Sequence, residues 1–187
     1  LRVLAHLAKD KAMINAFNSG EDIHTKTAGE VFNMPPLLVT PKMRSSAKAV
    51  NFGIVYGIGA FSLAQDIGVT RAEAQKYIDG YFETYPGIKE YMNTAVEQAK
   101  KQGYSTTMFG RRRYLPELNS SNGNLRAFGE RVARNMPIQG TAADIIKLAM
   151  IRTRDKLLES GLDARVILQV HDELIIEAEE SVAKEAG

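Results

Sequence analysis

Apolar residues recur with helical spacing through most of the first hundred residues. The spacing is clearest over residues 1–17, where one helical face would carry Leu1, Leu4, Ala5, Ala8 and Ala12. Comparable spacing predicts further helices over residues 22–33, 41–56, 61–68, 71–84 and 88–103. We therefore expect a mainly helical N-terminal part, which begins with one helix over residues 1–17.

Several of these helices have capping residues at their ends. Thr40 can accept a hydrogen bond from a free helical amide, and Pro41 suits the first helical position. Residues 70–73, with the sequence Thr-Arg-Ala-Glu, form a capping box. Gly68 and Gly103 are typical of the left-handed position that ends a helix. These residues indicate where the helices begin and end.

Two stretches favour strands instead. Residues 104–115 predict a small hairpin with Arg111, Arg112 and Arg113 beside its turn. Residues 165–170 and 174–176 are β-favouring runs that flank the sequence His171-Asp172-Glu173, which predicts a second hairpin with a polar tip. The expected fold class is α+β, with helices in the majority.

A polar, glycine-containing loop over residues 119–124 is expected to separate two lobes. Beyond it, one helix is predicted over residues 125–135 and ends near Pro137, because proline disrupts a helix interior. A second helix is predicted from Thr141 to Gly161.

Composition excludes several classes of protein. The 187 residues include no cysteine, so disulfides and cysteine zinc sites are excluded, and a reducing, cytoplasmic setting is expected. No apolar run approaches the roughly 18 residues that span a bilayer, so no membrane partner is expected. The net charge of +2 is too small to identify a nucleic-acid-binding protein by itself.

The helix predicted over residues 41–56 carries the strongest chemical signal. Arg44, Lys48, Phe52 and Tyr56 recur every four residues and would form one stripe, with two cations followed by two aromatics. A ligand with anionic oxygens at one end and a flat ring at the other, such as a nucleoside triphosphate, suits this order. The same spacing also fits an ordinary amphipathic helix whose aromatics face the core. Gly57 and Gly59 should end the helix, and Gly53 is expected to leave room beside the Phe52 ring.

The tip of the second hairpin carries the other candidate site. Adjacent carboxylates between apolar strands are costly unless a cation compensates their charge. We predict Asp172 as a metal ligand, with Glu173 in a secondary role through water or by orienting the tip. The alternative is a plain turn, in which aspartate is common. His24 is expected to be a surface or capping histidine.

Four motifs resemble family A DNA polymerases of the bacterial DNA polymerase I type. They are R-x3-K-x3-F-G-x2-Y-G over residues 44–57, GRRRYLP over 110–116, NMPIQGTAADIIKLAMI over 135–151 and LQVHDELIIE over 168–177. The motifs occur in the family's order, and the resemblance runs from Leu1 to about Glu177. It implies fingers over residues 9–118 and palm segments over residues 1–8 and 119–187.

The resemblance implies template-directed DNA synthesis, in which a primer 3′-OH attacks the α-phosphorus of a dNTP with two Mg²⁺ ions and pyrophosphate leaves. Arg44 and Lys48 would bind the triphosphate, and Lys48 could also protonate the leaving group. Phe52 would pack on the sugar and base, and Tyr56 would lie where the templating base stacks. Asp172 would bind metal with the assistance of Glu173.

The resemblance also implies contacts with primer–template DNA. The residues expected there are Arg131, Asn135, Gln139 and His171 in the minor groove and Arg111 and Arg112 at phosphates. A monomer is expected. In the family, a second metal aspartate precedes the segment that resembles residues 1–7. Neither Asp10 nor Asp22 has that context, so we expect the chain to be a fragment that is inactive alone.

Two alternatives stay open from the sequence. One is a single-subunit RNA polymerase, in which a tyrosine stands at the position of Phe52, so the phenylalanine favours DNA. The other is a non-catalytic nucleic-acid-binding module of the same fold. Retention of both Lys48 and Asp172 disfavours that module, because a scaffold needs neither a triphosphate ligand nor a metal carboxylate.

Overall fold

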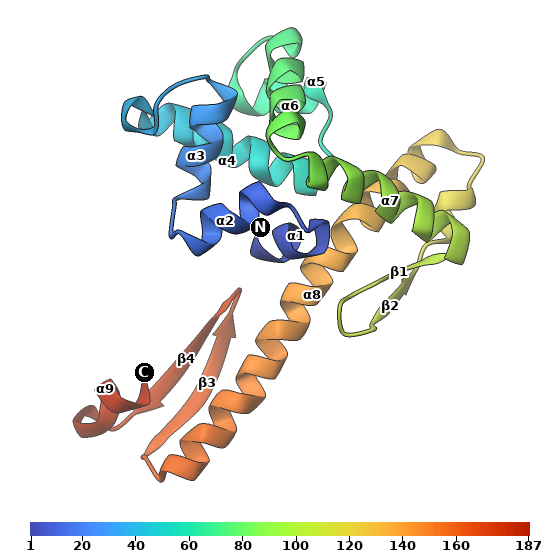
Figure 1. Ribbon diagram of the computed structural model, residues 1–187. Coiled ribbons are helices and arrows are strands. Elements are labelled where there is room, and N and C mark those ends of the chain that lie inside the picture. The colour runs from blue at the N-terminus through green and yellow to red at the C-terminus, as the bar shows by residue number, and fades with distance from the viewer. The chain divides into compact units, whose positions relative to one another are not determined.

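Helices dominate the computed structural model, which describes all 187 residues (Figure 1). The chain divides into two units, Leu1–Ile138 and Gln139–Gly187. The helices of the first unit are α1 (Arg2–Ala8), α2 (Lys11–Asn18), α3 (Ile23–Val31), α4 (Pro41–Val55), α5 (Ala60–Ile67), α6 (Arg71–Thr84) and α7 (Pro86–Gln102). Short 3₁₀ turns lie at Pro36–Leu38 and Pro116–Asn119.

The capping residues predicted from sequence lie where expected. The Thr40 hydroxyl accepts from the Met43 amide at 3.2 Å, and Thr70 forms a complete capping box with Glu73. Gly68 and Gly103 end α5 and α7 in the left-handed conformation, with φ of 69° and 81°. The α+β fold class is confirmed.

The prediction of one helix over residues 1–17 is wrong. The chain breaks at Lys9, which adopts φ 50°, and restarts with Asp10 as the N-cap of α2. One carboxylate oxygen of Asp10 accepts from the Met13 amide at 3.0 Å, and the other accepts from the Gly87 amide at 3.1 Å. Asp10 is buried, and both its local role as an N-cap and its contact with a distant amide support the break.

The prediction of two helices around Pro137 is also wrong, because α8 runs unbroken over Gly123–Ser160 with Pro137 inside it. Proline has no amide hydrogen, so the carbonyl of Ala133, four residues earlier, loses its helical partner. The buried Ser105 hydroxyl of strand β1 (Tyr104–Thr106) donates to that carbonyl at 3.4 Å. A residue from another element therefore satisfies the acceptor that the proline leaves open.

Replacing Ser105 by alanine should therefore destabilise the protein by about 1–3 kcal/mol, because a buried acceptor would lose its partner. Pro137→Ala supplies a backbone amide that can donate to the same carbonyl. Ser105→Ala should therefore lower the stability by a smaller amount in a protein that already carries Pro137→Ala. Urea denaturation of both single variants and the double variant measures the coupling. Equal costs of Ser105→Ala in both backgrounds would show that the two residues act independently.

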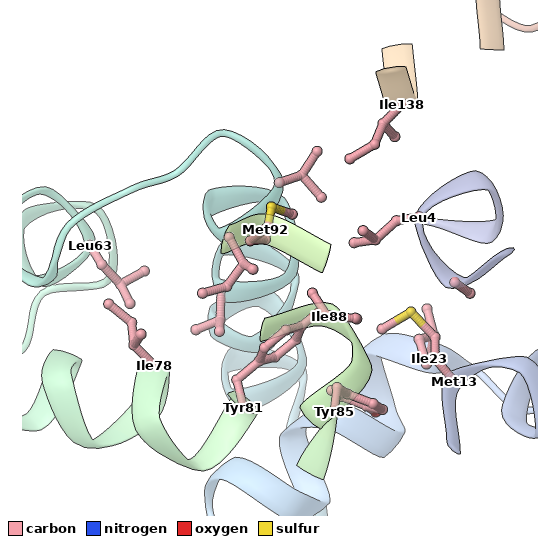
Figure 2. Packing of buried hydrophobic residues seen from close by; sticks show 14 of the residues in the cluster. Leu4, Met13, Ile23, Leu63, Ile78, Tyr81, Tyr85, Ile88, Met92 and Ile138 are labelled. Carbon is pink, nitrogen blue, oxygen red and sulfur yellow. The ribbon is translucent and has the colours of Figure 1, made fainter. Parts of the chain in front are cut away.

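The main core of the first unit lies between α1–α7 and the adjoining turn of α8. Figure 2 shows the packing of Leu4, Met13, Ile23, Leu63, Ile78, Tyr81, Tyr85, Ile88, Met92 and Ile138. A smaller cluster of Val96, Ala99, Leu115, Leu118 and Ala133 joins α7 and α8 to the segment that follows the hairpin of β1 and β2 (Arg112–Tyr114). That hairpin pairs Tyr104 with Tyr114 and Thr106 with Arg112.

The second unit contains the rest of α8, an antiparallel hairpin and a short terminal helix (Figure 1). The hairpin consists of β3 (Ala164–Val170) and β4 (Glu173–Ala178), followed by a 3₁₀ turn at Glu180–Val182 and α9 (Ala183–Ala186). The strands pair Ala164 with Ala178 and Val170 with Glu173, with a register shift between Val166 and Leu168. No helix of the chain combines the length and the apolar character that a membrane span requires.

Candidate functional site

The predicted stripe of α4 lies on the exposed face of the helix. Arg44, Lys48, Phe52 and Tyr56, the residue that caps the helix, are all exposed, and the two aromatics retain 40% and 47% of their accessible surface. The opposite face is buried and carries Ala47, Val50, Asn51, Ile54 and Val55. The alternative in which the aromatics face the core is therefore wrong. The four side chains of the predicted stripe are instead presented together along one side of a packed helix.

The turn after α4 fixes the position of Tyr56. Gly57 adopts φ 69° and donates to the Ile54 carbonyl at 2.9 Å, while the Ile58 amide donates to the Gly53 carbonyl at 2.8 Å. These two bonds form a Schellman motif. A Cβ added at Gly53 would lie 2.5 Å from Cγ2 of Ile58. A glycine at position 53 therefore makes room for Ile58, which closes the turn, while Gly53 also lines a hollow together with Phe52.

A hollow of about 470 Å³ lies at the aromatic end of the stripe. Its lining includes Phe52, Tyr56 and Arg131, so a residue predicted to contact DNA lies beside the two predicted to contact the nucleotide and template. The Arg131 guanidinium lies 5.9 Å from the centre of the Phe128 ring. The structure thus brings together side chains that are 75 or more positions apart in the sequence. The lining also includes Asp66, so the hollow offers two aromatic rings and one charge of each sign.

At the cationic end, Arg44 is paired with Asp22, the N-cap of α3. Nε and Nη2 of Arg44 donate to one Asp22 oxygen at 3.0 and 2.6 Å, and the other oxygen caps the amides of His24 and Thr25. The hydrogen bond from Arg44 and those from the capped amides lower the pKa of Asp22 to about 2. The carboxylate is therefore charged, and the pair present, at any pH well above 2.

His24, expected to be a surface or capping histidine, is half-buried in the first turn of α3 and contacts a residue of the stripe. Its ring packs against Phe52 with centroids 5.8 Å apart, and its Nδ1 lies 3.1 Å from Nδ2 of Asn51. Burial lowers the pKa of His24. Because Asn51 is 27 positions away, no local spacing in the sequence could have found this contact. The remaining signal was only the position of His24 in the first turn of α3.

Two of the residues predicted to contact DNA lie on α8 in the first unit. Arg131 is exposed, and Asn135 is partly buried with an Oδ1 atom that has no hydrogen-bond partner in the protein. Gln139 begins the second unit and is exposed. Because α8 continues through Pro137, the four-residue spacing of these three residues is kept within one helix.

The basic residues of the first hairpin lie at its exposed end. Arg111 is in the turn, where its amide and that of Phe109 donate to the buried Thr107 hydroxyl at 3.2 and 3.3 Å. Arg112 begins β2, and its guanidinium lies over the Tyr104 ring, 4.7 Å from the centroid. Both side chains are exposed and positively charged, which suits contacts with phosphate.

The second hairpin carries its polar residues at the tip, as predicted. His171 adopts φ 52° at the turn, and Gln169 Nε2 donates to its carbonyl at 2.5 Å. Asp172 and Glu173 are both exposed. Nowhere does the chain assemble three or more histidine, cysteine, aspartate or glutamate side chains that could hold a metal ion. The oxygens of Asp172 are of the type that Mg²⁺ prefers, but one carboxylate is too few ligands to hold the ion by itself.

Comparison with known sequences decides the family. The sequence model for DNA polymerase family A matches residues 1–187, the whole chain. This chain belongs to DNA polymerase family A.

The similarity of this family A chain to individual relatives is high. It is 57% identical over 178 residues to DNA polymerase I of Geobacillus stearothermophilus. This match covers 95% of the chain and 20% of that protein. It is 48% identical over 187 residues to the thermostable DNA polymerase I of Thermus thermophilus. This match covers 100% of the chain and 22% of that protein. The family A chain therefore spans about a fifth of the length of these relatives.

A solved structure has the same fold as this family A chain. It is the POL domain of Pol1 from M. smegmatis in complex with DNA primer–template and dNTP, with a TM-score of 0.95 and 46% sequence identity. The match covers 99% of the chain and 33% of that structure. The fold described above is thus that of a region of a DNA polymerase domain.

Proposed function

We propose that this chain is the nucleotide-binding region and part of the catalytic region of a template-directed DNA polymerase. The reaction is attack of a primer 3′-OH on the α-phosphorus of a dNTP, with release of pyrophosphate. One observation carries the proposal: in a family A chain, a single exposed stripe of α4 presents two cations and then two aromatics. That order matches the phosphates and the base of one nucleotide.

The residues of the stripe have distinct proposed roles. Arg44 and Lys48 bind the triphosphate oxygens and stabilise the charge that develops on the pyrophosphate, and Lys48 also protonates this leaving group. Phe52 packs on the sugar and base of the incoming nucleotide. Tyr56, at the end of the helix, lies where the templating base stacks. The hollow beside both rings supports these two assignments.

We assign Asp172 as one carboxylate ligand of a Mg²⁺ pair, with Glu173 orienting the tip or acting through water. When bound, the metal ions supply Lewis-acid stabilisation of the reacting phosphate and its leaving group. The chain's own contribution is an exposed carboxylate at a two-residue turn between paired strands. Because the chain holds no cluster of three ligands, the remaining carboxylates have to come from elsewhere in the longer protein.

The proposed DNA contacts would recognise the shape of a Watson–Crick base pair without distinguishing one base sequence from another. Purine N3 and pyrimidine O2 are minor-groove acceptors common to all Watson–Crick pairs. Arg131, Asn135, Gln139 and His171 supply donors for these acceptors. Arg111 and Arg112, which are exposed at the first hairpin, bind phosphates of the primer–template. A monomeric state and a cytoplasmic location remain predictions.

Primer extension tests the proposal. The full-length protein should extend a DNA primer on a DNA template with dNTPs and Mg²⁺, and should use ribonucleotides poorly. The isolated 187-residue chain should not extend it, because one carboxylate tip cannot hold two metal ions. Robust extension by the isolated chain would show that the catalytic site is misplaced, and preferred use of ribonucleotides would favour an RNA polymerase.

Replacing Phe52 by tyrosine should raise the incorporation of dideoxynucleotides by about 10- to 150-fold in the full-length protein. A dNTP can use its 3′-OH as an internal hydrogen-bond partner for its own phosphate, whereas a dideoxynucleotide cannot, and phenylalanine offers no replacement donor. One hydrogen bond to a charged oxygen contributes roughly 1.5–3 kcal/mol, which corresponds to that ratio. Use of normal dNTPs should change little.

Steady-state competition between dideoxynucleotides and dNTPs measures the change. Phe61→Tyr on α5 makes the same chemical change at another exposed position and should leave the ratio unaltered. An unchanged ratio in Phe52→Tyr would mean that this ring does not face the sugar.

A further inference from the structure

A chain of hydrogen bonds leads from the core of the first unit to the ligand-binding stripe. The Tyr85 hydroxyl lies 3.4 Å from Oγ1 of Thr27, which donates to Oδ1 of Asn51 at 3.3 Å. Nδ2 of Asn51 then lies 3.1 Å from Nδ1 of His24. Tyr85, Thr27 and Asn51 are fully buried, whereas His24 is half-buried. Polar groups this deeply buried are costly unless each one is paired, so their arrangement is strongly constrained.

The direction of each bond follows from counting hydrogens. Thr27 has one hydroxyl hydrogen, which it gives to Asn51, so Tyr85 must donate to Thr27. Because the Asn51 oxygen is already used, its amide nitrogen faces His24, and an amide nitrogen can only donate. Nδ1 of His24 must then accept. A neutral imidazole has one hydrogen, which is therefore on Nε2.

We infer that Asn51 is a positioning residue, which fixes the tautomer and the ring direction of His24 so that its Nε2–H stays available as a donor to a ligand bound along the stripe. Nε2 makes no hydrogen bond within the protein, and the ring rests against Phe52 of the stripe. Asn51 and Phe52 are neighbours in α4, with Asn51 on the buried face and Phe52 on the exposed one. The identity of the ligand rests on the proposed function, whereas the tautomer does not.

The environment of His24 favours the neutral form of its ring. Only this form has two tautomers. Burial lowers the pKa of His24, and the positive charges of Arg44, Lys48 and the nearby amino terminus act in the same direction. Only Asp22, which caps the same helix, acts to raise it. The ring is therefore neutral at neutral pH, and its hydrogen-bonding character depends on which nitrogen carries the hydrogen.

The tautomer can be measured directly in the full-length protein labelled with ¹⁵N in its histidine rings. The His24 signals are identified by their loss in His24→Gln. We expect Nε2 to be protonated and Nδ1 to be bare in the neutral form. A neutral ring with its hydrogen on Nδ1 would overturn the inference, and this measurement needs no substitution at Asn51.

Asn51→Asp provides the second test. A carboxylate can only accept, so it should draw a hydrogen onto Nδ1 and raise the His24 pKa by about 1–3 units. Asn93→Asp makes the same change at an exposed position of α7 and should leave that pKa unaltered. A folded Asn51→Asp variant with an unchanged His24 pKa would show that Asn51 does not act on the ring.

Kinetics link the ring to the ligand. The pH dependence of the dNTP KM should move upwards in Asn51→Asp together with the His24 pKa, and an unmoved profile would refute a role of the ring toward the bound ligand. Primer extension by the unsubstituted protein tests the proposed function separately. If it makes no DNA, the proposed function fails while the tautomer result stands on its own.

Discussion

Asp172→Ala in the full-length protein is expected to lower kcat by about 10³-fold or more while DNA affinity stays within a few-fold. A metal ligand acts on the chemical step, and a loss of that size corresponds to about 4 kcal/mol of transition-state stabilisation. The substitution should not disturb the hairpin, because Asp172 is exposed in the turn and lies outside the paired residues of β3 and β4. Single-turnover extension and DNA titration separate the two effects.

Glu177→Ala is the matched control for Asp172→Ala. Glu177 is an exposed carboxylate of the same hairpin, where it pairs with Arg165, away from the tip. Its removal should leave turnover nearly unchanged, because exposed ion pairs contribute only about 0–1 kcal/mol. Near-normal kcat in Asp172→Ala would rule out this residue as a metal ligand. Equal losses in both variants would indicate damage to the hairpin rather than to the chemistry.

Lys48→Ala should lower kcat by about 10²- to 10³-fold and raise the dNTP KM. A preorganised cation beside the leaving group stabilises charge that is larger in the transition state than in the bound substrate. Lys48 is exposed on the stripe between Arg44 and Phe52, so its loss leaves no cavity in the core. Pre-steady-state incorporation of a single nucleotide measures both parameters.

Lys42→Ala tests whether the effect belongs to the stripe. Lys42 is exposed in the first turn of the same helix but does not share the four-residue spacing. Lys42→Ala changes the net charge by the same amount as Lys48→Ala, and it should have little effect on kcat or on the dNTP KM. A rise in KM with normal kcat in Lys48→Ala would place this lysine in ground-state binding only.

Local signals explain which parts of the fold could be predicted. Thr40, Thr70, Gly68 and Gly103 act within one turn of their own helix, so the sequence alone indicates their roles. The polar tip around Asp172 was predictable for the same reason, because strand-favouring runs flank it closely. The stripe of α4 also depends only on spacing, although the side that faces solvent depends on the packing of the opposite face.

Contacts between distant residues explain what could not be predicted. The break at Lys9 is supported in part by Asp10 accepting from the amide of Gly87, and α8 continues past Pro137 with Ser105 on the carbonyl of Ala133. Neither partner lies within reach of a local pattern. The contact of His24 with Asn51 could not be predicted for the same reason, and the hollow beside Tyr56 is lined in part by Arg131 of the distant helix α8.

The Asp22–Arg44 pair has a consequence for selection among anions. Any phosphate that binds Arg44 has to compete with a carboxylate that is already in place and stays ionised down to pH values near 2. Since the pair is exposed, displacing it costs at most about 1 kcal/mol, or roughly fivefold in affinity. Under the proposed function, a triphosphate would also bind Lys48 and so offset that cost. An anion that binds Arg44 alone would bear that whole penalty, so under the proposed function Asp22 would favour a triphosphate over inorganic phosphate or chloride by up to about fivefold.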